Sequence, residues 1–341
     1  MAACPGPAVR FAGGDRGQRG QPRAWPDSPP AGAGTMKSAL HQRGAALLVA
    51  LLAVALATVL AVGLIERGQG TLARTQALIA SERSYQYAMG MNLLADRLIE
   101  RVMTENLDPS LLDGTWTPLY EVPGGLIQGR LLDQNARFNV NALAHPDRAR
   151  AGLAQERFER LLDQLGLSPI IAAELADWLE GASLPRPGSV GDSYYAGQRP
   201  PYRMAGTLLA HPSEMRWLRS VDESAWQRLA SLVTALPEPE LIVNVNTADA
   251  TILASLLPDL DMDSARRLAD DGPWTDVRSF LQHPLVQLHA VPGLELHLTV
   301  LSPWYLAQAR VVLDDVERDY FQLMRWGTSG YDFRLFSQGV P

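Results

Sequence analysis

The sequence predicts an α+β protein with a long N-terminal transmembrane helix, a small β-sheet head and a large inserted all-α domain of helical hairpins. Three observations lead to this prediction: an uncharged apolar run lies near the N-terminus, paired helical segments fill the middle of the chain, and strand-like segments lie on both sides of them. A length of 341 residues suggests about two domains. An apolar content of 47% is enough to build a sizeable core.

Residues 1–35 are rich in glycine and proline and show no hydrophobic period, so they cannot build a core. A second methionine, Met36, follows this segment. We expect Met36 to be the true start, with residues 1–35 a mis-called extension; a flexible cytoplasmic tail is the alternative. Residues 36–44 then form a short basic leader.

Residues 45–65 (AALLVALLAVALATVLAVGLI) form the predicted transmembrane segment, because they carry no charge. At about 1.5 Å per residue, the run reaches about 30 Å, the thickness of a bilayer core. Lys37 and Arg43 precede it, which favours a cytoplasmic N-terminus. A cleaved secretory signal peptide is the rival interpretation, but its apolar region is usually only about 7–15 residues long.

The helix is expected to continue beyond the membrane over residues 66–105. Apolar residues recur there at spacings of three and four, typical of one helix face. They are Tyr87, Met91, Leu94, Leu98 and Val102. Residues 106–109 (NLDP) should end this helix, because proline cannot continue it.

The head is expected to divide into three parts. Residues 106–144 hold strand-like segments at 115–122, 126–133 and 137–140. Residues 145–291 form the inserted α-helical domain, whose hairpins are expected at 155–181, 213–236 and 247–270. Residues 292–341 again hold strand-like segments, at 295–301, 305–313 and 320–325.

The composition limits the classes of function. Asp and Glu outnumber Lys and Arg by 37 to 30, and the net charge of −7 disfavours generic binding to a phosphate backbone. One cysteine excludes an intrachain disulfide. The sequence has no H-E-x-x-H, G-x-S-x-G, Walker A or G-x-G-x-x-G motif, and the six histidines show no paired ligand spacing. We therefore expect no catalytic residues and no enzyme activity.

A set of short motifs follows the basic leader in a specific order. They are residues 83–90 (RSYQYAMG), 132–143 (LDQNARFNVNAL), 177–179 (DWL), 192–195 (DSYY), 212–215 (PSEM) and 243–248 (VNVNTA). Each is weak alone. Together, at these spacings, they resemble the type II secretion system minor pseudopilin K family (general secretion pathway protein K), from Met36 to the C-terminus.

The resemblance implies processing of the N-terminus. Pseudopilins are cut after a glycine by the prepilin peptidase, and the new N-terminal residue is then methylated. The matching bond here is Gly44–Ala45, with N-methylation at Ala45. An uncleaved signal anchor is the alternative.

The resemblance also bears on mature position five. Most pseudopilins carry Glu there, whereas this chain has Val49. Members of family K share the absence of this glutamate and are placed at the filament tip.

The resemblance also implies a location and partners. The chain is expected to be a single-pass protein of the cell inner membrane with its C-terminal head in the periplasm. Its partners would be minor pseudopilins I, J and H, the prepilin peptidase and the inner-membrane secretion platform. Association is expected through the apolar face of the long helix and the edge of the head sheet. The large inserted domain would obstruct a subunit stacked above it, which fits a subunit that initiates or caps a filament for protein export.

The alternative function is a membrane-anchored helix-hairpin-helix DNA receptor, because residues 243–248 also resemble the start of such modules. The hairpin that follows, residues 258–263 (PDLDMD), has no glycine and three carboxylates, which would repel phosphate. We therefore expect no nucleic-acid partner. Asn244 and Asn246 are predicted to bond turn backbone groups, and Thr247 to be a helix N-cap.

The same acidic hairpin has the D-x-D-x-D spacing of an EF-hand loop. It has Ser264 where that loop needs glycine and Asp270 where it prefers glutamate, so a helix-capping acidic turn is the favoured interpretation. The resemblance implies a different calcium site, in the loop after residues 177–179. The matching positions are Glu180, Asp192 and Tyr195, but two expected acidic residues are missing, one of them at Gly191. Calcium takes six to eight oxygen ligands, so this loss should weaken or abolish the site.

Overall fold

The computed structural model describes residues 39–105, 112, 114–181, 184–314, 316–327 and 330–339. The expected extension at residues 1–35 and the start of the leader, residues 36–38, lie outside these residues. The chain divides into two compact units, Met1–Thr71 and Leu72–Pro341. Each unit is described by itself.

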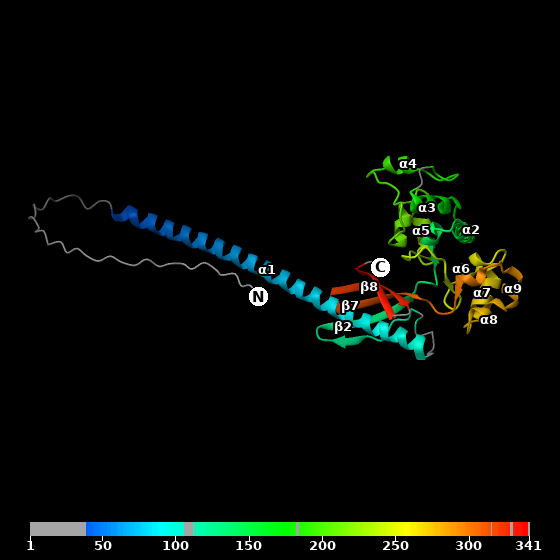
Figure 1. The fold of residues 1–341 in the computed structure, drawn as a ribbon. Helices are drawn as coiled ribbons and strands as arrows, with labels where there is room; N and C mark the ends of the chain where they lie inside the picture. The colour runs from blue at the N-terminus through cyan, green and yellow to red at the C-terminus, as the bar shows by residue number, and fades with distance from the viewer. Residues whose placement is uncertain are drawn as a thin grey trace, which may run out of the picture. The chain divides into compact units, whose positions relative to one another are not determined.

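Helix α1 (Ala39–Glu105) begins in the first unit (Figure 1). The large apolar side chains described there are exposed. Its segment Ala46–Val102 is long and apolar enough to cross a membrane, with a mean hydropathy of 2.9 over its most apolar window. The helix ends at Glu105, directly before the predicted NLDP stop. The prediction of one long helix that contains the apolar run is therefore confirmed, but the helix begins at Ala39, within the expected leader.

The second unit contains an antiparallel sheet of five strands in the order β1-β2-β7-β8-β9. The strands are β1 (Tyr120–Val122), β2 (Gly125–Asp133), β7 (Trp304–Leu313), β8 (Val316–Gly327) and β9 (Gly330–Gln338). Strands β2 and β7 are neighbours although most of the chain's helices lie between them in sequence (Figure 1). The helical part is therefore an insertion into the sheet, as the α+β prediction requires.

The C-terminal half of α1 packs on one face of this sheet. Ile99 and Val102 lie in one apolar cluster with Tyr305, and Ala88 and Met91 lie in a second with Val311. Gly129 permits this close approach, because a Cβ at that position would come within 2.6 Å of the Met91 side chain. Alternate residues of β7 thus face α1, and the intervening residues point to the opposite face.

The inserted part builds a single large core. Its helices are α2 (Arg148–Gln164), α3 (Ile170–Glu180), α4 (Asp192–Ala196), α5 (Glu223–Leu229), α6 (Ala250–Leu256), α7 (Met262–Asp270), α8 (Val277–Leu281) and α9 (Pro284–His289), with 3-10 turns η2 (Val140–Ala144), η3 (Pro212–Trp217) and η4 (Leu294–His297). Short parallel pairs join β3 (Phe138–Asn139) to β4 (Val233–Thr234) and β5 (Val243–Asn244) to β6 (Leu298–Thr299).

Three sequence predictions of local structure are wrong. Residues 137–140 are not a head strand: Phe138 is fully buried in the helical core, and β3 pairs with β4. The second helix of the hairpin expected at 213–236 ends at Leu229, because the β-branched residues Val233 and Thr234 pair as an extended segment. Of the strand expected at 295–301, only Leu298–Thr299 are extended, as β6; residues 295–297 lie in η4, which begins after Gly293 in the left-handed conformation (φ 79°).

Candidate functional site

A network of polar side chains joins the end of β2 to the turn before α6. Asp133, 8% exposed, lies at its centre. Its Oδ1 accepts from the backbone N of Asn135 at 2.8 Å and of Ala136 at 3.2 Å. Its Oδ2 accepts from Asn244 Nδ2 at 2.8 Å and from Thr247 Oγ1 at 2.5 Å. Two motifs that are 111 residues apart in sequence therefore meet at one carboxylate.

Burial raises the pKa of Asp133 above its usual range, and the hydrogen bonds that it accepts oppose this rise. The amides around it are also satisfied: Asn135 Nδ2 donates to Ile242 O at 2.9 Å, and Asn135 Oδ1 accepts from Trp304 N at 3.1 Å. Because Trp304 begins β7, these bonds fix where the chain leaves the sheet and where it returns.

The structural role predicted for the motif at residues 243–248 is confirmed in part. Asn246 Oδ1 accepts from Trp274 N at 2.6 Å, and Asn244 Oδ1 accepts from Asn246 N at 3.1 Å. The prediction that Thr247 is a helix N-cap is wrong. Asp249 caps α6 instead, because α6 starts at Ala250 and the Thr247 hydroxyl donates to Asp133.

The acidic hairpin caps a helix, as the favoured interpretation predicted. The Asp261 carboxylate accepts from Ser264 N at 2.9 Å and from Ser264 Oγ at 2.7 Å, and it is the N-cap of α7. These hydrogen bonds lower the pKa of Asp261. Asp263 pairs with Arg266 at 2.8 Å. This geometry gives no support to phosphate binding by the hairpin.

The proposed calcium ligands are engaged by protein groups. Glu180 Oε1 accepts from Arg186 Nη2 at 2.9 Å. Arg186 also binds Asp177, whose side chain is 1% exposed, through its backbone N and its guanidinium. Asp192 Oδ1 accepts from Met204 N at 2.9 Å. Residues 182–183 of this loop lie outside the described residues.

These contacts do not fit a calcium site. Within the described parts of the chain, no group of three or more His, Cys, Asp and Glu side chains could hold a metal ion. Burial disfavours the charge of Arg186, but its hydrogen bonds to Glu180 and Asp177 raise its pKa above the ordinary value. A guanidinium charge thus already pairs with Glu180, one of the two carboxylates that the cation would need, and with the neighbouring Asp177.

We expect calcium to leave the thermal stability of the protein unchanged, because Arg186 already neutralises Asp177 and Glu180. The measurement is a pair of melting curves for the full chain in detergent, one with millimolar calcium and one with excess chelator. A melting temperature several degrees higher with calcium would show that Glu180 and Asp192 retain the predicted site.

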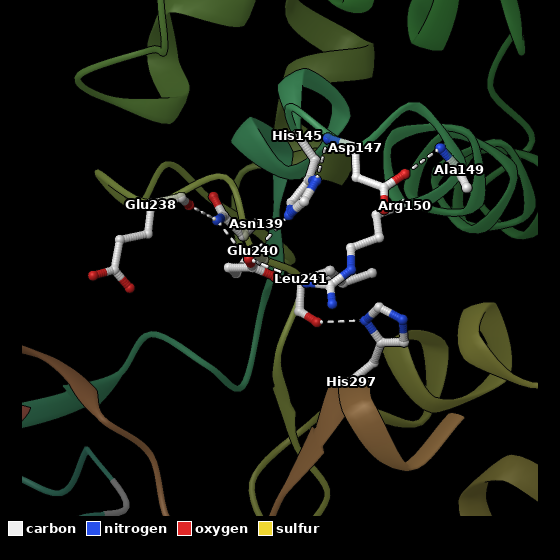
Figure 2. Close-up of polar contacts among 9 residues, drawn as sticks. All are labelled: Asn139, His145, Asp147, Ala149, Arg150, Glu238, Glu240, Leu241 and His297. Carbon is white, nitrogen blue, oxygen red and sulfur yellow. Dashed lines mark hydrogen bonds and ion pairs between the residues drawn. The ribbon is translucent and has the colours of Figure 1, made fainter. Parts of the chain in front are cut away.

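A second polar cluster ties the segment before β5 to α2 (Figure 2). His145 Nδ1 accepts from Asp147 N at 2.9 Å, so its Nε2 carries the proton and donates to Glu240 at 2.9 Å. Arg150 lies 3.5 Å from the same carboxylate. His297 Nδ1 donates to the backbone O of Leu241 at 3.0 Å. No signal in the sequence brought these residues together.

A groove lies between α1 and the β1 edge of the sheet. Its volume is about 250 Å³, and its lining includes Met91, Leu94, Thr117 and Tyr120. Leu94 and Tyr120, which line it, are 60% and 47% exposed; their neighbours in sequence, Leu93 and Leu119, do not line it and are 61% and 59% exposed. Large apolar side chains that gather on one exposed face mark a candidate interface.

Comparisons with known proteins agree with this fold. Family models described as "Type II secretion system (T2SS), protein K" match residues 136–238 and 243–300. The chain is 31% identical over 303 residues to the type II secretion system protein K of Klebsiella pneumoniae, covering 84% of this chain and 93% of that protein. The protein K of Aeromonas hydrophila is 29% identical over 306 residues, covering 82% and 91%.

A solved structure is also similar: the GspK-GspI-GspJ complex of the enterotoxigenic Escherichia coli type 2 secretion system. The match has a TM-score of 0.69 and 26% identity, and covers 79% of this chain and 100% of the matched chain. Fold and matches together define a secretion-system component with a helix able to span a membrane. The chain belongs to the type II secretion system protein K family, which confirms the resemblance found in its motifs.

Proposed function

We propose that the chain is a non-enzymatic minor pseudopilin at the tip of the type II secretion pseudopilus, where it initiates and caps the filament that drives protein export. The observation that carries this proposal is the likeness, over 79% of the chain, to a protein solved in complex with GspI and GspJ. Pseudopilins I and J are therefore its proposed partners. Pseudopilin H and the inner-membrane platform complete the proposed assembly.

The exposed apolar groove beside α1 is the proposed contact for these partners. Leu94 on the helix and Tyr120 on β1 line this groove and are 60% and 47% exposed, so they offer apolar area to a partner. Val49, in place of the carboxylate common at mature position five, is consistent with a subunit that has no neighbour above it. The inserted helical domain adds bulk that suits a cap.

We expect Leu94→Glu to weaken co-purification of pseudopilins I and J from detergent-solubilised membranes by at least about tenfold, because a charge would be buried in an apolar interface. Leu288→Glu is the matched control, since Leu288 is 76% exposed on α9 and does not line the groove. Equal recovery of both partners with the two variants would contradict the proposed contact.

The N-terminal anchor is proposed to be processed. The prepilin peptidase would cut the Gly44–Ala45 bond on the cytoplasmic side, and Ala45 would then be methylated, with the head in the periplasm. The apolar part of α1 that follows this bond supports a single-pass anchor. The bond lies in the backbone of α1, close to its start at Ala39.

We expect intact-mass measurement of the purified protein to give a chain that starts at a methylated Ala45. Gly44→Leu should retain the leader, because a bulky side chain would obstruct the peptidase at the scissile bond. Gly90→Leu is a control outside the leader, at a position with open space for a side chain. A mature N-terminus elsewhere would overturn the assignment.

A further inference from the structure

A cleft lies between the inserted helical domain and the sheet face opposite α1. Its volume is about 380 Å³, which is within the range of about 300–1,000 Å³ typical of ligand pockets. Leu306 and Gln308 of β7 and Leu323 of β8 form its floor. His211 and Trp226 line it from the helical side.

The charged side chains that line the cleft are basic, and none of the lining residues is acidic. Arg130 and Arg137 are the two arginines. Arg130 is fixed in place: its Nε donates to Gln308 at 2.8 Å, and its guanidinium lies 4.6 Å from the centre of the Trp116 ring. For Arg137, among the described residues, the structure gives no side-chain hydrogen bond or ion pair.

The electrostatics of the cleft favour a negative occupant. Burial lowers the pKa of Arg137, and the charge of Arg130 lowers it further; the nearby Asp133 opposes both effects. Asp133 cannot serve as a full partner, because four donors already occupy its oxygens. The Arg137 guanidinium is half-buried, lies near another cation and has no bonded counter-ion in the described chain. A carboxylate that binds there would therefore stabilise its charge strongly.

The lining also favours one class of ligand over another. Leu132, Leu306, Pro212 and Trp226 form apolar walls around the arginines, and such walls suit amino-acid side chains better than a run of phosphates. The net charge of −7 repels every anion at long range, and it repels nucleic acid, with one charge per phosphate, more than a short peptide with few carboxylates. Local positive charge in an apolar cleft is instead complementary to a carboxylate that lies next to an apolar side chain.

We propose that this cleft binds an acidic peptide segment of another protein, with Arg137 pairing with a carboxylate and Trp226 and Phe321 packing against an apolar side chain next to it. This assignment does not depend on the groove beside α1. The linings of the groove and the cleft share Arg130 and Gln308, but the groove is otherwise lined by α1 and β1, and the cleft by the helical domain and β8.

The test is fluorescence anisotropy with the full chain in detergent and a labelled peptide of alternating Asp or Glu and Phe or Leu residues. A matched peptide with Asn and Gln in place of the acids is the ligand control. We expect the acidic peptide to bind, and we expect its affinity to fall at least about tenfold with the amide peptide or with Arg137→Gln. Arg137→Gln removes the positive charge of this side chain. It removes no hydrogen bond, because the part of the chain that the structure describes gives none to the Arg137 side chain.

Arg278→Gln is the protein control, because Arg278 is exposed on α8 and does not line the cleft. Trp226→Ala, a second variant, should also weaken binding, since it removes an apolar wall. The proposal is overturned if the acidic peptide does not bind, if the amide peptide binds equally well, if Arg137→Gln and Arg278→Gln behave alike, or if a single-stranded oligonucleotide binds as tightly as the peptide.

Discussion

Asp133→Ala should lower the free energy of unfolding by about 3–5 kcal/mol, because it leaves buried donors without an acceptor. The orphaned groups are the backbone N of Asn135, the amide of Asn244 and the hydroxyl of Thr247. A loss of this size corresponds to a fall of roughly 6–20 °C in melting temperature for a head of this length. Thermal unfolding of the full chain in detergent, followed by circular dichroism, is the measurement.

Asp222→Ala provides a matched control, because Asp222 is also a carboxylate that accepts from a backbone N, at 2.7 Å from Ala225. It is an exposed helix N-cap, whose loss costs about 1 kcal/mol. Asp133→Asn should fall between the two variants, since one oxygen remains as an acceptor. Equal melting temperatures for Asp133→Ala and Asp222→Ala would show that the network does not hold the sheet and the helical domain together.

Arg186→Met should cost about 3 kcal/mol, because it leaves the Asp177 carboxylate charged and unpaired in the core. The Asp177 side chain is 1% exposed, and Arg186 binds it through both its backbone N and its guanidinium. The double variant Asp177→Asn, Arg186→Met should recover part of this loss, because the unpaired charge is then absent. Chemical denaturation of the full chain measures all three proteins.

The control for this prediction is Arg216→Met. Arg216 pairs with Glu223 at 2.8 Å, but the two side chains are 54% and 59% exposed, so their ion pair is worth at most about 1 kcal/mol. If the Arg186 and Arg216 variants lose the same stability, Arg186 does not act as the internal cation of the loop between α3 and α4.

For much of the candidate site, the sequence predicted the structural role of a motif but not the residues that it contacts. The motif around Asn244 was correctly assigned a structural role, because asparagine side chains bond turn backbone. Its partner Asp133 was missed as a site residue, since nothing local indicates that a carboxylate at a strand end will be buried. Arg186 was missed for a similar reason: a basic residue in a loop is usually solvated, and only the fold brings it to Asp177.

The sequence alone determined the membrane-spanning part of α1, the α+β class and the family. These depend on local properties: an uncharged apolar run, helical periodicity and short motifs in a fixed order. The tertiary structure decided which distant residues meet. The pairing of β2 with β7, the Asp133 network and the arginine-lined cleft all depend on contacts between segments far apart in the chain, as with Arg130 and Gln308, which are separated by 178 residues. Such contacts follow from burial and strand pairing across the whole head, which no local pattern encodes.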